Sequence, residues 1–186
     1  MKNVITSPFY WYGETAWQIN AKGKGLRTDI LKSLFSQLQT MMNYHRKVFV
    51  FRFDLHTPSY TPENTLITDF NRRFFKRIKR HYGVKRIAYN WVRELEKAKS
   101  QHYHYLIILD GSKIQYPEHL QSWITEIWGH LDGTAHWAGY HLLGRNDETK
   151  KHAVSYHISY LAKARGKGYR PTQTKDYGGS RLKYDG

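Results

Sequence analysis

Cysteine does not occur in this chain of 186 residues. Disulfide bonds and thiolate zinc sites are therefore excluded, and any metal ion must be bound through nitrogen and oxygen atoms. Long apolar runs are also absent: no stretch reaches the roughly 18 apolar residues that would span a bilayer, and residues 1–8 lack the apolar core of a secretion signal. We therefore expect a cytoplasmic location. No Walker-type Gly-x-x-x-x-Gly-Lys-Ser/Thr segment is present, so we expect no ATP-driven motor, and unwinding of a duplex would need a partner.

Acidic residues are few relative to basic ones. The chain has 15 Asp and Glu residues against 30 Lys and Arg residues, a formal net charge of +15. Such an excess is typical of domains that displace counterions from phosphates, so we expect a nucleic-acid partner, although solubility alone would also explain it. Anionic membranes attract basic proteins as well, but no long basic stretch carries the apolar stripe of a lipid-binding helix, and we expect no membrane partner.

Composition divides the chain into two parts. Residues 1–25 are aromatic and then rich in Gly and Lys, ending in Lys22-Gly23-Lys24-Gly25. We predict that they form an N-terminal extension or mobile linker without a catalytic role. Residues 26–186 have the length of one domain. From about residue 165 the chain is basic and Gly-rich, which indicates a loop or arm.

Hydrophobic periodicity predicts an α+β fold. The predicted elements are, in order, helix 27–43, strand 48–56, a helix with Thr61 as N-cap and Pro62 in its first turn that ends at Gly83, strand 86–96, a strand from His102 to Leu109, helix 117–129, strand 137–143 and helix 149–164. From residue 48 onward, the order strand, helix, strand, strand, helix, strand is that of ferredoxin-like or RRM-like folds. In these folds we expect helices to cover one face of an antiparallel sheet.

The second predicted helix is strongly basic. Its apolar positions recur every three or four residues, and the remaining surface is crowded with cations: Arg72, Arg73, Lys76, Arg77, Lys79 and Arg80. This face is a candidate for contacts to a DNA backbone, and a solvated charged face explains it about equally well. In the tail, Lys167 and Arg181 are further candidates for DNA contacts.

Two histidines, His102 and His104, lie on one predicted strand with a single residue between them. Side chains at i and i+2 project from the same face, so both imidazoles can bind one cation. If the preceding loop is symmetric about Lys99, Glu96 lies opposite His102 and Glu94 lies opposite His104. The hairpin then brings carboxylates and imidazoles together, and the pattern predicts a site for Mg²⁺ or Mn²⁺.

The sequence does not decide which acid is the third protein ligand of this site. Glu94 is our preferred acid, while Glu96 and Asp54, the latter on the neighbouring strand, are alternatives. Imidazole is a better ligand for Mn²⁺ than for Mg²⁺, so Mn²⁺ is expected to bind more tightly even where Mg²⁺ is more abundant. A register slip of one residue would turn the acids away from the histidines.

Tyr156 and Tyr160 are four residues apart on the last predicted helix, and Lys163 follows. Residues at i and i+4 share a helix face. A cation that binds a phosphodiester and a phenol that attacks it are the two parts of a covalent strand transfer. With 11 histidines and 15 tyrosines in the chain, either motif can also arise by chance, with the tyrosines serving only to anchor the helix.

At these residues the chain resembles the HUH endonucleases that initiate rolling-circle replication. More closely, it is similar to the inovirus gene-two type replication proteins, a prophage-associated family also called YagK/YfjJ. The resemblance covers approximately residues 26–183 and is carried by these segments: Arg52-Phe53-Asp54-Leu55-His56, Trp91-Val92-Arg93-Glu94, His102-Tyr103-His104 and Tyr160-Leu161-Ala162-Lys163. Ser159 departs from the two-tyrosine class, which often has lysine there.

The resemblance implies the HUH fold, with residues 26–186 as the nicking domain, and a bacterial host cell. It implies that Tyr160 is the nucleophile, that Tyr156 is either a second nucleophile or structural, and that Lys163 assists. The expected activity is metal-dependent nicking and religation of single-stranded DNA at a replication origin. A phosphotyrosine would form at the 5′ end, and the free 3′-OH would serve a host polymerase, with a host helicase as a further partner.

Two other functions are compatible with the sequence. A non-catalytic module could bind single strands by phosphate contacts and stacking, and a metal-dependent RNA nuclease would leave the tyrosines unexplained. The sequence also leaves open whether the chain is an active initiator or a decayed prophage remnant.

Overall fold

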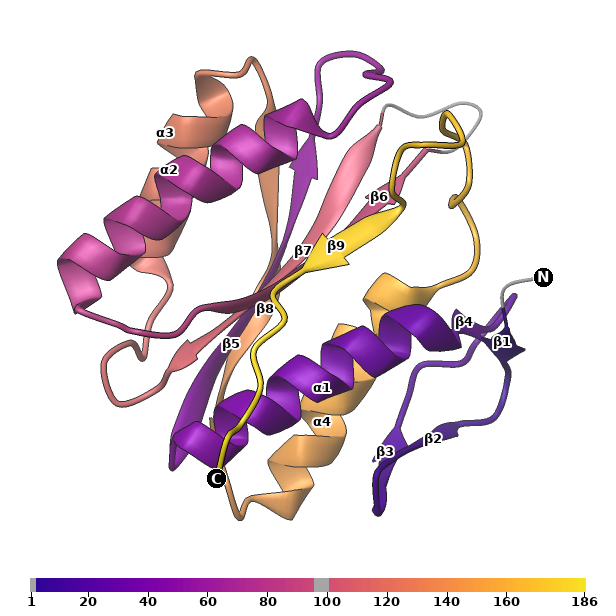
Figure 1. Ribbon diagram of the computed structural model, residues 1–186, viewed down its shortest axis with the longest axis vertical. Coiled ribbons are helices and arrows are strands. Elements are labelled where there is room, and N and C mark those ends of the chain that lie inside the picture. Colours follow the sequence, from indigo (N-terminus) through magenta and orange to yellow (C-terminus); the bar gives the residue numbers. More distant parts are fainter. Residues whose placement is uncertain (1–2, 96–100) are drawn as a thin grey trace.

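The structure is a computed structural model that describes residues 3–95 and 101–186. Its centre is an antiparallel five-stranded sheet with the order β8-β5-β7-β6-β9 (Figure 1). The strands are β5 (Lys47–His56), β6 (Ala88–Glu94), β7 (His102–Asp110), β8 (Thr134–Gly144) and β9 (Tyr177–Gly179). Without β9, the sheet has the strand order of a ferredoxin-like fold, and the predicted α+β class is confirmed.

Helices cover both faces of the sheet, not one as we expected (Figure 1). The helices are α1 (Thr28–Tyr44), α2 (Thr65–Tyr82), α3 (Glu118–Gly129) and α4 (Glu148–Ile158). Phe49, Phe51 and Phe53 of β5 pack in one core cluster with α2 and α3. Val48 and Val50, which project from the opposite face, pack with α1 and α4. The central strands are therefore apolar on both sides, which requires a second helical layer.

The start of α2 differs from the prediction. α2 begins at Thr65 with Asn64 as its N-cap residue, three residues after the predicted N-cap Thr61. The backbone carbonyls of Thr61 and Glu63 accept hydrogen bonds from the buried Arg93, which fixes this segment as a loop. At the other end of α2, Gly83 ends the helix in the left-handed conformation with φ 60°, as its sequence position predicted.

The last helix is shorter than predicted. α4 ends at Ile158, and a 3-10 helix, η1 (Ser159–Ala162), continues the chain. The Ser159 hydroxyl donates to the carbonyl of Tyr156, and the backbone N–H of Asn20 donates to the same hydroxyl. These bonds tie the turn to the N-terminal segment, and Tyr160 therefore lies on η1 and not on a continuous α-helix.

Residues 4–27 are not the mobile linker that we expected for residues 1–25. They form two antiparallel pairs: β1 (Val4–Ile5) with β4 (Leu26–Arg27), and β2 (Phe9–Tyr12) with β3 (Thr15–Gln18). Trp17 is buried and stacks on Phe35 of α1 with ring centroids 4.9 Å apart. Ile19 is also buried in the core cluster that contains Trp17 and α1, so the segment is part of the core.

The tail after residue 165 is likewise built into the fold. β9 pairs with β6 and extends the sheet. The buried guanidinium of Arg27 donates to Asp176 over 2.8 Å, which joins β4 to the segment before β9. The tail is therefore not a free arm.

The hairpin of β6 and β7 has a register that differs by two residues from the prediction. Glu94 lies opposite His102, and Val92 lies opposite His104. The ladder ends there because the N–H of Leu95 donates to the carbonyl of Gly166, while Gln101 bonds to Thr57 and Thr61. Glu96 and Lys99 lie outside the described residues. Within residues 3–95 and 101–186, no helix combines the length and apolar character needed to cross a membrane.

Candidate active site

Three neighbouring strands place four ionisable side chains at one end of the sheet. Asp54 comes from β5, Glu94 from β6, and His102 and His104 from β7, and Asp54 lies directly opposite His104 in the ladder. Strand residues two apart share a face, and here it is the face covered by α1 and α4, because Leu106 of β7 packs in that core cluster.

The group Glu94, His102 and His104 could hold a metal ion. Glu94 Oε2 lies 2.8 Å from His104 Nε2 and 3.4 Å from His102 Nε2, and the two Nε2 atoms are 3.2 Å apart. One ligand atom from each residue lies within 4.8 Å of the others. Two imidazole nitrogens and one carboxylate oxygen are suitable donors for a first-row divalent ion.

Asp54 contacts the opposite side of the same imidazole. His104 Nδ1 lies 2.7 Å from Asp54 Oδ1, and an ionised carboxylate can only accept, so Nδ1 is the donor. A carboxylate in this position orients a metal-binding histidine and leaves Nε2 to face the ion. Asp54 is thus placed to support His104, while Glu94 is the acid that faces both histidines.

Buried charges are balanced within this cluster. Burial opposes ionisation of Glu94, but hydrogen bonds from the two histidines and the charge of Lys167 hold the pKa of its carboxyl far below the usual value. Burial likewise opposes the charged form of Asp54, and its hydrogen bond to His104 lowers its pKa. For His104, burial acts to lower the pKa, but bonds to the two carboxylates raise it. A metal ion at Nε2 would take the place of that proton.

Tyr160 packs directly on this cluster. Its ring meets the imidazole of His104 edge to face, with centroids 5.3 Å apart. The guanidinium of Arg52 lies 4.2 Å from the centroid of the same ring, and Arg165 donates to the phenolic oxygen over 3.3 Å. His104 and Tyr160 are far apart in the sequence, but the fold brings their rings into contact.

Tyr156 and Lys163 are placed differently from Tyr160. In the part of the chain that the structure describes, the ring of Tyr156 makes no ring contact with either histidine. The ammonium of Lys163 donates to the carbonyl of Lys22 over 2.5 Å and to the side chain of Asn20 over 3.1 Å. It therefore holds the N-terminal segment, and it is not directed at the phenol.

Lys167 is a buried member of the cluster. Only 2% of its side chain is exposed, and its ammonium lies 2.8 Å from Glu94 Oε1. It also donates to the backbone carbonyl of Lys163. A residue that we expected on the surface thus links the metal-binding group to the end of η1.

The remaining DNA-contact candidates are distributed over the surface. Of those on α2, Arg77 forms a bidentate ion pair with Glu126 of α3, and Arg72 pairs with Asp69. The other four candidates on α2 and the tail residue Arg181 have exposed side chains: Arg73, Lys76, Lys79, Arg80 and Arg181.

Arg52 and Arg165 were missed as partners of Tyr160. For Arg52 a signal existed, because alternation along residues 48–56 puts Arg52, Asp54 and His56 on one face. For Arg165 there was none, since its approach depends on the turn that follows η1.

The model of the YagK/YfjJ C-terminal domain family matches residues 14–180. No curated protein and no solved structure matches the chain.

Proposed function

The chain belongs to the YagK/YfjJ C-terminal domain family, and from this premise and the geometry of its site we propose that it nicks and religates single-stranded DNA through a phosphotyrosine intermediate. In this role it would initiate rolling-circle replication of a phage or prophage element at an origin sequence or hairpin. The observation that carries the proposal is the contact of the Tyr160 ring with His104, whose Nε2 also faces Glu94 and His102.

The residues of the chain divide the reaction between them. Tyr160 Oη attacks the scissile phosphorus; the new O–P bond forms as the P–O3′ bond breaks, the phenolic proton is released to solvent, and the leaving 3′ oxygen gains a proton. Because one phosphate ester replaces another, the step is reversible and allows religation. Arg52 against the ring and Arg165 at the hydroxyl hold the phenol in one orientation.

Glu94, His102 and His104 are the proposed ligands for Mn²⁺ or Mg²⁺. A bound divalent ion would polarise the scissile phosphate and offset the charge that develops on it. Asp54 would fix the orientation of His104, and Lys167 would fix that of Glu94. We expect the His102→Ala/His104→Ala variant to lose activity together with metal binding.

The test is a denaturing gel of the protein with 3′-labelled single-stranded origin DNA and Mn²⁺. The label should migrate with the wild-type protein, because the 5′ end of the labelled fragment becomes attached to Tyr160. Tyr160→Phe should abolish this adduct and leave DNA binding intact, whereas Tyr116→Phe, a matched change at an exposed tyrosine far from the site, should retain it. The Tyr156→Phe variant decides whether a second tyrosine takes part.

Two outcomes would contradict the proposal. An undiminished adduct in Tyr160→Phe would rule out this nucleophile, and cleavage that persists in EDTA would rule out the metal. A non-catalytic binding module, which the net charge of +15 also favours, predicts salt-sensitive binding with no adduct under any condition.

A further inference from the structure

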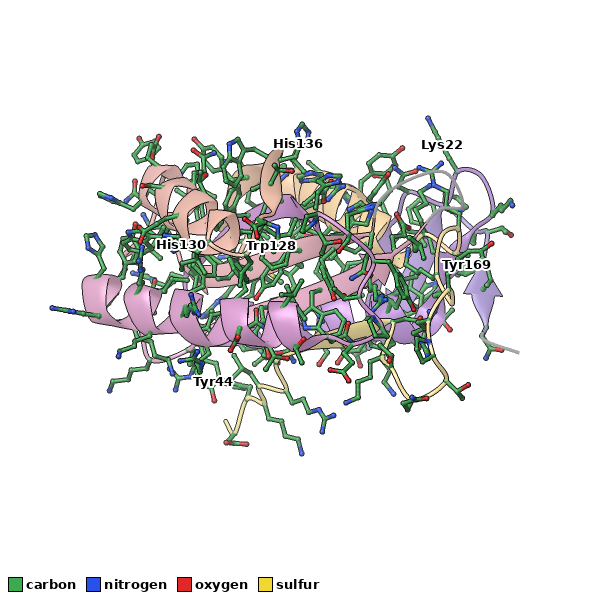
Figure 2. The ribbon with its side chains drawn as sticks, turned by 90° about the horizontal axis from the view of Figure 1, so that it is seen from above. Lys22, Tyr44, Trp128, His130, His136 and Tyr169 are labelled. Carbon is green, nitrogen blue, oxygen red and sulfur yellow. The ribbon has the colours of Figure 1, made fainter. Side chains whose placement is uncertain are left out.

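A cleft opens beside Tyr160. It has a volume of about 560 Å³ and is lined by Asn20 and residues 22–25 of the N-terminal segment, by Tyr160, by residues 163–166 and by Tyr169. Lys22 and Tyr169 lie at the same end of the molecule, as Figure 2 shows, although 147 residues separate them (169 − 22 = 147). The N-terminal segment, to which the sequence assigned no role, thus forms one wall of a cleft at the candidate nucleophile.

The cleft is strongly cationic. Four of its lining residues are basic, namely Lys22, Lys24, Lys163 and Arg165, and none of those that the structure describes there is acidic. Burial lowers the pKa of Lys163, and the charges of Arg165 and Lys22 lower it further. The charges of Lys22 and Lys163 therefore oppose one another in a small space, and a bound anion would offset that repulsion.

The wall that carries Lys22 and Lys24 is held in place. The N–H of Ala164 donates to the carbonyl of Gly25 over 3.0 Å, and Lys163 donates to the carbonyl of Lys22. Gly25 has φ +77°, and a Cβ there would lie 2.6 Å from Val4 Cγ1, so this close turn requires glycine. The loop is tied to the residues that follow Tyr160, and the cleft is preformed.

An aromatic side chain stands at the same cleft. Tyr169 is 50% exposed and lines the cleft. An exposed aromatic face next to cations is the combination that binds single-stranded nucleic acid, because unpaired bases stack on the ring while lysines contact the backbone. In a duplex the base faces are covered by their neighbours and only base edges reach the grooves.

We infer that this cleft binds a nucleotide of single-stranded DNA adjoining the phosphate that Tyr160 attacks. Its phosphate is bound by Lys22 and Lys24 and its base stacks on Tyr169. The inference rests on the proposed function for the identity of the strand, and it extends the site from the metal-binding group to the N-terminal segment.

To test this inference, DNA binding is measured in a variant that cannot cleave the strand. The full-length Tyr160→Phe protein is titrated into a fluorescently labelled single-stranded oligonucleotide at several salt concentrations. Tyr169→Ala should weaken binding by about 5- to 150-fold, the range for loss of one base stack. Tyr169→Phe should bind as the parent does. Lys22→Ala should reduce the slope of log K against log salt by about 0.7, the value for one phosphate contact on a single strand.

Matched controls lie at the opposite end of the sheet. Lys85→Ala and Tyr116→Ala remove the same groups from exposed positions near the start of β6 and the end of β7. If cleft and control variants bind equally well, the inference is overturned. A different result would separate the two proposals. If only the cleft variants lose affinity and the wild-type protein forms no covalent adduct with DNA, the nicking proposal fails, while the cleft remains a binding site for single-stranded DNA.

Discussion

At the scale of single residues, His104 connects every part of the candidate site. Its Nδ1 faces Asp54, its Nε2 faces Glu94 and His102, and its ring packs nearly perpendicular to the ring of Tyr160. His104 is 3% exposed, so these contacts form in a place where water competes little. One side chain therefore links the group that could hold a metal ion to Tyr160, the candidate nucleophile.

Asp54→Asn is expected to lower Mn²⁺ affinity by about 10- to 100-fold, because an amide no longer orients His104 as a carboxylate does. Isothermal titration calorimetry with Mn²⁺ measures the effect. The matched control is Asp110→Asn, since Asp110 pairs with His45 over 3.5 Å at the far end of β7. Affinity in Asp54→Asn equal to that in the control would show that Asp54 does not support the metal site.

Single residues of the site were predictable to the extent that strand alternation decides their face. Alternation predicted that His102, His104 and Glu94 share a face, and these three form the group that could hold a metal ion. The roles of the two lysines were not predictable. Lys163 reaches the N-terminal loop while Lys167 reaches Glu94, and the direction of a long flexible side chain depends on tertiary contacts that periodicity does not report.

At the scale of elements, the β6–β7 hairpin shows why an incorrect register still led to the correct group. Glu94 faces His102 and not His104 as expected, a difference of two residues. Because side chains alternate with a period of two, a shift by two leaves every residue on its face. A shift by one would have separated acid and histidines.

The N-terminal strands were not predictable because they are very short. β1 and β4 have two residues each, and pairing of this length is decided by the surface that the segment packs on. The same holds for the three residues of β9. The longer helices α1, α2 and α3 carry enough periodic positions to be identified from the sequence alone.

Trp17→Ala tests whether the N-terminal segment belongs to the fold. Trp17 is 2% exposed and stacks on Phe35, so its truncation should lower the free energy of unfolding by about 3–5 kcal/mol. Urea denaturation provides the measurement. Trp11, which is 68% exposed on β2, serves as the control, and its replacement by Ala should cost no more than about 0.5 kcal/mol. If both variants lowered the free energy of unfolding equally, residues 1–25 would be a linker that does not contribute to the fold.

At the scale of the whole molecule, the two faces of the sheet carry different charged features. The candidate site lies on the face of α1 and α4, whereas the basic helix α2 covers the other face (Figure 1). A strand bound at Tyr160 would have to pass around the sheet to reach α2. The net charge of +15 is therefore shared between a local site and a remote surface.

This arrangement predicts a dependence on DNA length. With a long single strand, Arg73→Ala/Lys76→Ala should reduce the salt slope by about 0.7 for each lost phosphate contact. With an oligonucleotide of a few nucleotides around the nick, the same variant should bind like the parent. Fluorescence anisotropy at several salt concentrations separates the two cases. If the salt slope of this variant with the long strand were unchanged, the basic surface of α2 would be a solvated charged face that does not contact DNA.

The anchoring of η1 has a mechanical consequence. Leu161 and Ala162 are buried in the core next to Tyr160, and Lys163 forms a bridge with Leu26 of β4. If a DNA strand were esterified at Tyr160, tension from a moving polymerase or helicase would act on η1, which is anchored in the core and to β4. It would not act on a flexible chain terminus. The protein would then resist being pulled open while it holds the severed DNA.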